Sequence, residues 1–314
     1  MLLRVVVVAT LALTTAPIHA QSPKLAFKPG GAGLYDFDTG PLRGRLKLDG
    51  RFQGVYPLID AESGADLTHP PGVFSPYRVF KTGTRYGHAA RDWPTTSKVL
   101  EDGAVEVHWP AAKEHPIEMT GVYRWKAPDV LDLLITVKPE EDMPEFELFM
   151  SSYFTKGFRA SVYVKGQGEA AGKPEFVPVD RKPGSKGGYV MFPRDEKAVR
   201  LIRDGRWKIP PNAVDWAIER PLAAPLVLRR DAASGITAAM MCPPEDCFAV
   251  GSPWNPATPK GGGYRSLYLS LFGRDVKAGQ QSRARCRVVI GRGISDERAV
   301  ELYRAYVKEA EQGR

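Results

Sequence analysis

Apolar side chains recur at every second position in several segments of this chain. In one segment, Val105, Val107 and Trp109 alternate with polar neighbours. The same spacing recurs at residues 131–137, 267–271 and 283–290. Successive side chains of a β-strand point to opposite faces, so a period of two indicates strands with one face inward. The pattern predicts a fold built from half-buried strands.

Turn-forming residues separate these segments. Turns containing glycine or proline stand at residues 102–103, 139–142, 166–172, 184–188 and 261–263. The chain holds 31 glycines and 27 prolines, which suits many loops between short strands. We therefore expect an all-β sandwich. The sequence shows neither an internal repeat nor a long linker, so residues 21–314 are predicted to form a single domain.

The end of the chain has the pattern of a helix instead. Ser295 is a candidate N-cap, and Asp296 and Glu297 follow in the first turn, where the helix dipole favours anions. An apolar stripe with helical spacing comes next, formed by Ala299, Leu302, Tyr303, Tyr306 and Ala310. This spacing predicts a C-terminal helix that packs on a sheet.

The first residues have the layout of a secretory signal peptide. Arg4 gives a basic start, residues 5–13 are apolar, and Ala20 ends the segment before Gln21. The apolar run is shorter than the roughly 18–20 residues of a membrane span. Residues 1–20 are therefore predicted to be cleaved, leaving a secreted or periplasmic protein; the alternative is an uncleaved anchor. No later stretch is apolar enough to cross a bilayer.

The chain is basic, with a formal net charge of +8. The excess of basic residues falls late in the chain, at residues 194–206, 229–230 and 283–292. For an exported protein, nucleic acid is not the expected partner, and the charge favours an anionic glycan or an acidic surface. The alternative is a solubilising exterior, since the arginines of residues 283–287 alternate with apolar residues along one predicted strand.

The cysteines allow one short disulfide. Cys242 and Cys247 bracket a small loop that an oxidising compartment could close, whereas Cys286 falls on the apolar face of its strand and is predicted to be a buried free thiol. The Cys242–Cys247 spacing differs from that of a zinc knuckle, and no second pair exists. A serine-hydrolase elbow, a zinc-protease histidine pair and a phosphate-binding loop are also missing from the sequence. We expect neither a metal nor a cofactor.

Residues 76–93 combine aromatic and polar side chains more densely than a hairpin requires. The candidates are Arg78, Tyr86, His88, Arg91, Asp92 and Trp93. Arginine and histidine can hold hydroxyls or a carboxylate, and flat aromatic faces can carry a sugar ring. The alternative is structural, with Arg78 paired to Asp92 and the aromatic rings in the core.

A second candidate cluster contains Trp207 and Trp216 together with Asp204, Asp215 and Glu219. Indoles and carboxylates could line a glycan cleft, and two carboxylates could serve as acid and base in glycoside hydrolysis. The alternative is a proline-rich loop fastened by the packing of its tryptophans.

The order of segments from residue 50 to 155 resembles the aldose 1-epimerase (galactose mutarotase) superfamily. The resemblance rests on Gly87–Trp93, the hairpin at 98–103 and the strands at 105–109, 117–125 and 131–137; residues 267–290 resemble the closing strands of that fold. It implies an antiparallel β-supersandwich with an open concave face for a sugar, to which the residues after Ser295 add the predicted C-terminal helix.

The resemblance also implies roles for single residues. In the family, the histidine of a His-Pro-Tyr-Phe segment protonates the ring oxygen; in this chain Ser151-Ser152-Tyr153-Phe154 stands at that place, and a serine hydroxyl cannot supply the proton near neutral pH. His88 matches the family's substrate-holding histidine, and Arg78 its sugar-holding arginine. The resemblance thus implies sugar binding without ordinary mutarotase activity.

Three functions remain open on the sequence. The first is an exported protein that binds or remodels a carbohydrate. The second is a polysaccharide lyase for an acidic glycan, with Tyr86 or Tyr153 as the base, Arg78 or Arg91 against the uronate carboxylate, and His88 assisting. The third is a non-catalytic structural or partner-binding protein of the cell envelope.

Overall fold

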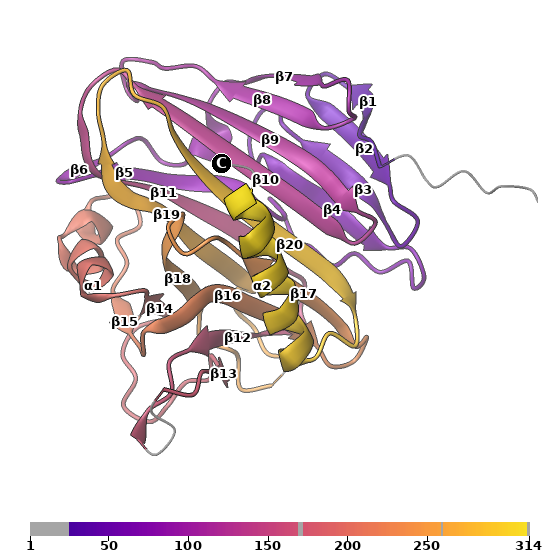
Figure 1. The fold of residues 1–314 in the computed structure, drawn as a ribbon, viewed down its shortest axis with the longest axis vertical. Helices are drawn as coiled ribbons and strands as arrows, with labels where there is room; N and C mark the ends of the chain where they lie inside the picture. The colour runs from indigo at the N-terminus through magenta and orange to yellow at the C-terminus, as the bar shows by residue number, and fades with distance from the viewer. Residues whose placement is uncertain (1–24, 169–171, 259, 313–314) are drawn as a thin grey trace, which may run out of the picture.

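A computed structural model of the chain describes residues 25–168, 172–258 and 260–312. The signal peptide predicted for residues 1–20 lies outside this part. The described residues form three β-sheets with a helix at the end of the chain (Figure 1). The structure confirms the predicted all-β fold with a C-terminal helix. None of the helices in the described ranges is long and apolar enough to cross a membrane.

The largest sheet has nine strands in the order β13-β12-β16-β17-β20-β10-β9-β8-β7. Their bounds are β7 Thr96–Val99, β8 Val105–Trp109, β9 Ile117–Ala127, β10 Val130–Pro139, β12 Phe158–Val164, β13 Glu175–Pro178, β16 Leu222–Asp231, β17 Ile236–Met241 and β20 Ser282–Arg292. All of its neighbouring strands are antiparallel.

The second sheet has seven strands in the order β15-β14-β18-β19-β11-β5-β6. Their bounds are β5 Ser75–Lys81, β6 Thr84–Arg85, β11 Met143–Tyr153, β14 Tyr189–Pro193, β15 Trp216–Ile218, β18 Cys247–Pro253 and β19 Ser266–Val276. The edge pair β14–β15 is parallel, which departs from the antiparallel arrangement expected for the sandwich.

A smaller antiparallel sheet precedes these two, in the order β1-β2-β3-β4. Its strands are β1 Lys28–Gly31, β2 Leu34–Asp38, β3 Leu42–Lys47 and β4 Gly54–Asp60. The helical elements are the 3-10 turns η1 Ala90–Asp92 and η3 Arg206–Lys208 and the α-helices α1 Glu196–Arg203 and α2 Asp296–Gln312.

The two large sheets face each other across the main hydrophobic core. Leu133 and Val288 enter this core from the nine-stranded sheet, and Leu148 and Leu269 enter it from the seven-stranded sheet. The other face of the seven-stranded sheet is also covered, by α1 and η3 over Phe149 and neighbouring rings. The sandwich therefore carries a further apolar layer on the outside of its seven-stranded sheet.

This second layer corrects one expectation about β19. Residues 267–271 were expected to have one face in water, yet Tyr268 and Ser270 are buried like Leu267 and Leu269. Tyr268 belongs to the layer under α1 and η3, whereas Leu269 belongs to the main core. A period of two shows that a strand has two different faces, and only tertiary packing decides whether both are dry.

The structure confirms the predicted C-terminal helix, including its N-cap. The backbone N–H of Arg298 donates to Ser295 Oγ over 3.1 Å, as an N-cap requires. The buried residues of α2 include Ala299, Tyr303 and Tyr306. With these side chains α2 packs on the outer face of the nine-stranded sheet, where Figure 1 shows it crossing β20 and β17.

An ion pair at the end of two strands ties the small sheet to the nine-stranded sheet. Arg292 of β20 donates to both carboxylate oxygens of Asp60 in β4, over 2.9 and 2.7 Å. The hydrogen bonds from Arg292 and from Ser63 lower the pKa of Asp60 well below its ordinary value of 3.8, although burial opposes them. Folding therefore favours the ionised carboxylate.

This ion pair predicts a pH-dependent contribution to stability. Because the folded-state pKa is the lower one, the contribution is complete above about pH 4 and disappears as the pH falls through the folded pKa. We expect Asp60→Asn to lower the free energy of unfolding at pH 7 by about 2 kcal/mol. Urea denaturation of both proteins at several pH values measures the difference. A gap that stayed constant down to pH 2 would contradict this explanation.

The structure does not form the possible disulfide between Cys242 and Cys247. Cys242, Cys247 and Cys286 are all free and buried. Cys242 follows β17, Cys247 begins β18, and both side chains enter the main core. The Cys242 thiol lies 3.6 Å from the sulfur of Cys286, and burial raises its pKa well above the ordinary value. The thiol predicted for Cys286 is thus one of three in the core. The 242–247 loop is held by Asp246, whose Oδ2 accepts from Arg285 Nε over 2.7 Å.

Candidate functional site

A cavity of about 730 Å³ opens on the outer side of the seven-stranded sheet, beside the layer formed by α1 and η3. We refer to it as the aromatic cavity. It is lined by Phe52, His69, Pro70, Pro71, Tyr77, Arg78, His88, Arg91, Phe149, Tyr153, Tyr189, Trp207, Asn212, Ala213, Val214, Trp216, Tyr264 and Tyr268. Its volume lies in the range of small-molecule sites, roughly 300–1,000 Å³.

The floor of the aromatic cavity is built on neighbouring strands. Phe149 and Tyr153 stand four residues apart on β11, and therefore point to the same face of the sheet. Tyr268 on the adjacent β19 stacks on Phe149, with 4.6 Å between the ring centroids. The rings present a flat, rigid apolar surface to the cavity.

A β-bulge adds two consecutive side chains to this floor. The pairing of β5 with β11 shifts by one residue: Phe149 faces Arg78, but Met150 faces Pro76, so Tyr77 is the extra residue. In a regular strand, Tyr77 and Arg78 would point to opposite faces, and the bulge lets both line the cavity. The position of Arg78 thus depends on a local irregularity of the strand.

Arg78 is a buried cation whose donors are only partly used. Its side chain is 3% exposed, and Nη2 donates to the carbonyl oxygen of Asn212 over 2.8 Å. Its Nε and Nη1 have no hydrogen-bond partner in the described part of the protein. The guanidinium carbon lies 5.0 Å from the ring centre of Tyr77 and 5.2 Å from that of Trp207. Nε and Nη1 of this planar cation thus keep hydrogen-bonding capacity that no described residue uses.

Arg91 supplies a second guanidinium from the 3-10 turn η1. It is 7% exposed, and its charge lies over three rings, at 4.5 Å from the centre of Tyr77, 5.4 Å from that of Phe52 and 5.6 Å from that of Tyr153. Nη1 reaches the hydroxyl of Tyr153 at 3.5 Å, and Nε has no partner among the described residues. This aromatic cage fixes the position of the cation without neutralising it.

Among its described residues, the aromatic cavity is lined by basic side chains and by no acidic ones. Its described residues include Arg78, Arg91, His69 and His88, and no aspartate or glutamate. Across the described ranges, no ion pair within 4.0 Å includes Arg78 or Arg91. Two buried cations without a counter-ion favour a ligand that brings a negative charge. No group of three or more His, Cys, Asp or Glu side chains in the described part is placed to hold a metal ion.

Arg85 fastens the two loops that form the rim. Its Nη2 donates to the carbonyl of His88 over 2.8 Å, and its Nη1 donates to the carbonyls of Ile209 and Pro211. Burial, and next the charge of Arg78, lowers the pKa of Arg85 to about 10. Asn212, the residue after Pro211, has a backbone φ of 59°. Its side-chain amide nitrogen lies 3.3 Å from Nε2 of His88. His88 and Asn212 are thereby held side by side.

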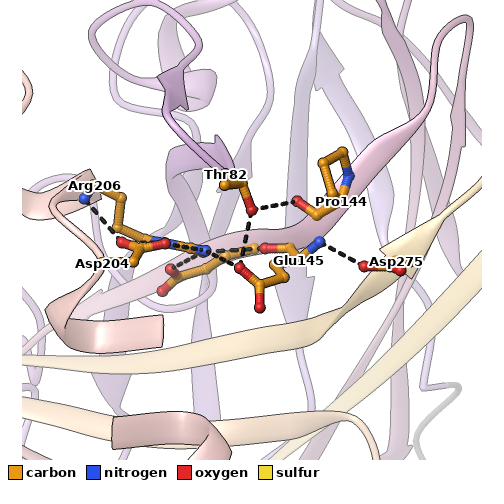
Figure 2. A network of polar contacts seen from close by, with 7 residues as sticks. Thr82, Pro144, Glu145, Asp204, Arg206 and Asp275 are labelled. Atoms are coloured by element: carbon orange, nitrogen blue, oxygen red, sulfur yellow. Dashed lines mark hydrogen bonds and ion pairs between the residues drawn. The ribbon is translucent and has the colours of Figure 1, made fainter. Parts of the chain in front are cut away.

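A buried ionic network, part of which Figure 2 shows, anchors the turn that carries Trp207. Arg206 is buried and donates to Asp204, to the Glu145 carbonyl and, over 3.0 Å, to Glu147 on β11. Burial acts against the charge, but Glu147 and Asp204 raise the pKa of Arg206 above its usual value. The network fixes η3 to the sheet.

The anchored turn places Trp207 among the rings of the sheet. Its ring lies 4.9 Å from Phe80, 4.6 Å from Phe149 and 5.1 Å from Trp216, measured between centroids. In Figure 2, Thr82 and Asp275 also contact Glu145, on the strand that carries the network. The two tryptophans predicted from the sequence therefore share one wall of the cavity.

The structure brings together six of the side chains singled out in the sequence. Arg78, His88, Arg91, Tyr153, Trp207 and Trp216 all line the aromatic cavity. They come from β5, η1 and its preceding loop, β11, η3 and β15. Residues from both predicted clusters, far apart in the chain, thus meet in one place.

Tyr86 does not belong to the site. Its hydroxyl donates to Glu141 over 2.9 Å, and its ring is buried in the main core. Burial raises the pKa of Tyr86 to about 12, so it cannot serve as the base proposed from the sequence.

Asp92 and Trp93 are also corrected. Asp92 Oδ1 accepts from the backbone N–H of Phe52 over 3.0 Å and so supports a lining residue from behind. Trp93 is buried and stacks on His115, with centroids 3.8 Å apart. The 3-10 turn η1 directs Arg91 into the cavity and its neighbours away from it. The alternative pairing of Arg78 with Asp92 does not form, because Arg78 contacts Asn212 instead.

The carboxylates of the second cluster do not form an acid–base pair in the cavity. Asp204 contacts Arg206, Asp215 contacts Lys208, and Glu219 contacts Lys182. None of the three lines the aromatic cavity. Ser151, at the place of the family's acid histidine, is buried and donates to the carbonyl of Ser75 over 2.9 Å.

Several lining residues were missed in the sequence. Phe52 and Tyr264 are 42% and 62% exposed, and they are the exposed large hydrophobic residues of the described part. His69, Tyr189 and Asn212 also line the cavity. Tyr189 and Tyr264 each follow a run of glycines, and an aromatic residue in such a loop is a signal that could have marked them.

No model of a known protein family matches the sequence, and no curated protein matches it either. The fold, however, is similar to solved structures. One is the aldose epimerase homologue of C. elegans, with 10% identity, coverage of 83% of this chain and 99% of that one, and a TM-score of 0.47. Another is the galactose 1-epimerase of Lactobacillus acidophilus, with 8% identity, coverage of 83% and 95%, and a TM-score of 0.45.

A heparan sulfate lyase from Pedobacter heparinus is also similar, with 10% identity and a TM-score of 0.48. The match covers 88% of this chain but only 38% of the lyase. At such identities the likeness concerns the fold and gives no information on a shared ligand.

Proposed function

We propose that the protein binds a saccharide carrying a carboxylate or sulfate in the aromatic cavity. The observation that carries the proposal is Arg78, a cation 3% exposed whose Nε and Nη1 have no partner in the described part of the protein. An unpaired buried charge costs folding free energy, so its retention at a cavity wall favours a role in binding an anion. A carboxylate or sulfate oxygen can accept a charge-assisted hydrogen bond from a guanidinium N–H.

The rest of the lining suits the sugar ring. Rings on the floor and on the tryptophan wall offer apolar faces to C–H groups, while His88, Asn212 and Tyr153 offer partners to hydroxyls. Phe52 and Tyr264, which are exposed and line the same cavity, offer further ring faces at its rim.

We also propose that the protein is exported, because the N-terminal sequence has the layout of a cleavable signal. An anionic polysaccharide outside the cytoplasm would then be the accessible ligand. Expression of the full chain followed by N-terminal sequencing tests this part. A mature protein that begins at Gln21 is expected, and a chain retained in the cytoplasm with its N-terminus intact would contradict export.

Binding is tested with a panel of neutral, uronate and sulfated oligosaccharides. Trp207 and Trp216 line the cavity, so tryptophan fluorescence should change on occupancy, and calorimetry gives the affinity independently. Saturable binding of anionic but not of neutral members is expected. Failure of every anionic member to bind at millimolar concentration would overturn the proposal.

A second candidate function is elimination at a uronate, favoured by the contact between Arg91 and Tyr153. A base removes the proton beside the carboxylate, the electron pair forms the new carbon–carbon double bond, and the glycosidic C–O bond breaks as its oxygen takes up a proton. Arg91 Nη1 lies 3.5 Å from the Tyr153 hydroxyl, so one cation adjoins both the candidate base and the space for a carboxylate.

Elimination has a direct readout, the ultraviolet absorbance of the unsaturated product. If the protein is a lyase, Tyr153→Phe should abolish the increase while the uronate still binds. If wild-type protein binds uronate polymers but the absorbance stays flat, the lyase function is refuted and binding alone remains.

A further inference from the structure

A second cavity of about 640 Å³ adjoins the aromatic cavity. The two share Tyr189 and Tyr264 in their linings, so they meet at these rings. The second cavity continues past them along Arg181 and Trp254. We refer to it as the distal cavity.

We propose that the distal cavity is a second saccharide subsite, so that the ligand is an oligosaccharide chain spanning both cavities. This inference rests on the proposed function of the aromatic cavity. A monosaccharide needs only one of the two cavities, whereas a chain that leaves the first passes the shared rings and enters the second.

The shared ring suits a chain that runs across it. Tyr264 is 62% exposed and lies after the glycines at 261–263, in a loop without a regular element. An exposed tyrosine offers a flat face to a sugar unit and a hydroxyl to its neighbour. Placed between two cavities, it can contact the units on either side of one glycosidic bond.

The distal cavity repeats the chemistry of the first, with an aromatic residue and a cation. Trp254 is half-buried against the main core and keeps an indole N–H without a partner in the described part of the protein. Arg181 is exposed, donates to the carbonyl of Gly187 over 2.9 Å, and forms no ion pair within the described ranges. An arginine of this kind can meet the charge of a second acidic unit.

Hydrogen bonds hold the residues at the base of the distal cavity. The carboxylate among its described lining residues, Asp180, is paired with an arginine. Asp180 accepts from Arg159 over 2.7 Å and from the Asn255 amide over 2.9 Å. Asn255 also accepts from the backbone of Ala160 over 2.7 Å, which ties the cavity to β12. Among the described lining residues, Arg181 is thus the cation without an acidic partner. The distal cavity therefore favours an anion, as the aromatic cavity does.

The test compares affinity with chain length in two aromatic variants. The probes are oligogalacturonate, oligomannuronate and hyaluronan series from the monosaccharide to the tetrasaccharide. Wild-type protein should bind the tetrasaccharide more tightly than the monosaccharide. Trp254→Ala, in the distal cavity only, should weaken tetrasaccharide binding about tenfold, or 1.4 kcal/mol, and leave monosaccharide binding unchanged. Phe52→Ala, in the aromatic cavity only, should weaken both by the same factor.

The outcomes separate the two proposals. If no series binds to wild-type protein, the proposed function itself fails. If the monosaccharide binds as tightly as the tetrasaccharide, or if Trp254→Ala weakens both equally, the distal subsite is refuted while the aromatic cavity stands. Should Trp254→Ala fail to fold, as judged by its circular dichroism, the exposed Arg181→Gln provides the same comparison, with the loss again confined to the longer chains.

Discussion

Replacing Arg78 with methionine is expected to weaken the binding of an anionic saccharide by about 100-fold. The guanidinium is buried, and its Nε and Nη1 have no partner within the described part of the protein. In a water-poor cavity a charge-assisted hydrogen bond is stronger than in water, and removing the guanidinium leaves the ligand's charge without this partner. Such losses cost about 2–5 kcal/mol, and a factor of 100 corresponds to about 2.7 kcal/mol.

The same substitution should leave the fold intact. Methionine is also unbranched and can fill the space of the arginine stem, and it removes a cation that has no counter-ion in the described part of the protein. The free energy of unfolding should therefore change by less than about 1 kcal/mol, since the lost bond to Asn212 is offset by the relief of desolvation. Calorimetry for binding and urea denaturation for stability measure the two effects. An Arg78→Met variant that binds the anionic saccharide as tightly as the wild-type protein, or that fails to fold, would contradict the role assigned to Arg78.

Replacing Arg206 with methionine is expected to have the largest effect on stability, a loss of about 3–5 kcal/mol. Glu147 lies fully buried on β11, and without Arg206 its carboxylate has no cation to compensate its desolvation. The turn η3 would also lose its attachment to the sheet, and Trp207, which lies in this turn, would lose its fixed position. Urea denaturation measures the loss.

A double variant distinguishes an ionic effect from a simple loss of packing. If the cost comes from the orphaned carboxylate, Arg206→Met with Glu147→Leu should regain most of the lost free energy, because a buried ion pair can be replaced by apolar side chains. A double variant as unstable as the single one would show that the loss does not come from the unpaired charge of Glu147. As a control, Lys277→Met, whose partner Asp142 is exposed, should change stability by less than about 1 kcal/mol.

Much of the fold could be predicted because strand alternation and helix capping are local properties. The alternation at residues 105–109 and 131–137 corresponds to β8 and β10, and Ser295 caps α2 as predicted. What the sequence does not show is which faces become covered. The burial of both faces of β19 depends on α1 and η3, a short helix and a turn that pack on it from elsewhere in the chain.

The candidate site was predicted in composition but not in geometry. Arg78, Arg91 and Tyr153 could be chosen because their chemistry suits an acidic sugar, and they do meet. The bulge at Tyr77 and the turn η1 decide which neighbours point inward, and neither follows from a period of two. Tyr86 and Trp93 were chosen on the same chemistry and proved to be core residues, since type alone does not distinguish a lining ring from a buried one.

The most direct test is a thermodynamic cycle on one functional group of the ligand and one residue of the protein. The affinity of the uronate tetrasaccharide that binds best is measured against that of its carboxyl-reduced form, for the wild-type protein and for Arg78→Met. Reduction is expected to weaken binding to wild-type protein about 100-fold and binding to the variant hardly at all, because the two groups meet each other. Equal affinity of the wild-type protein for both forms would contradict the central claim that Arg78 holds the anionic group of a sugar.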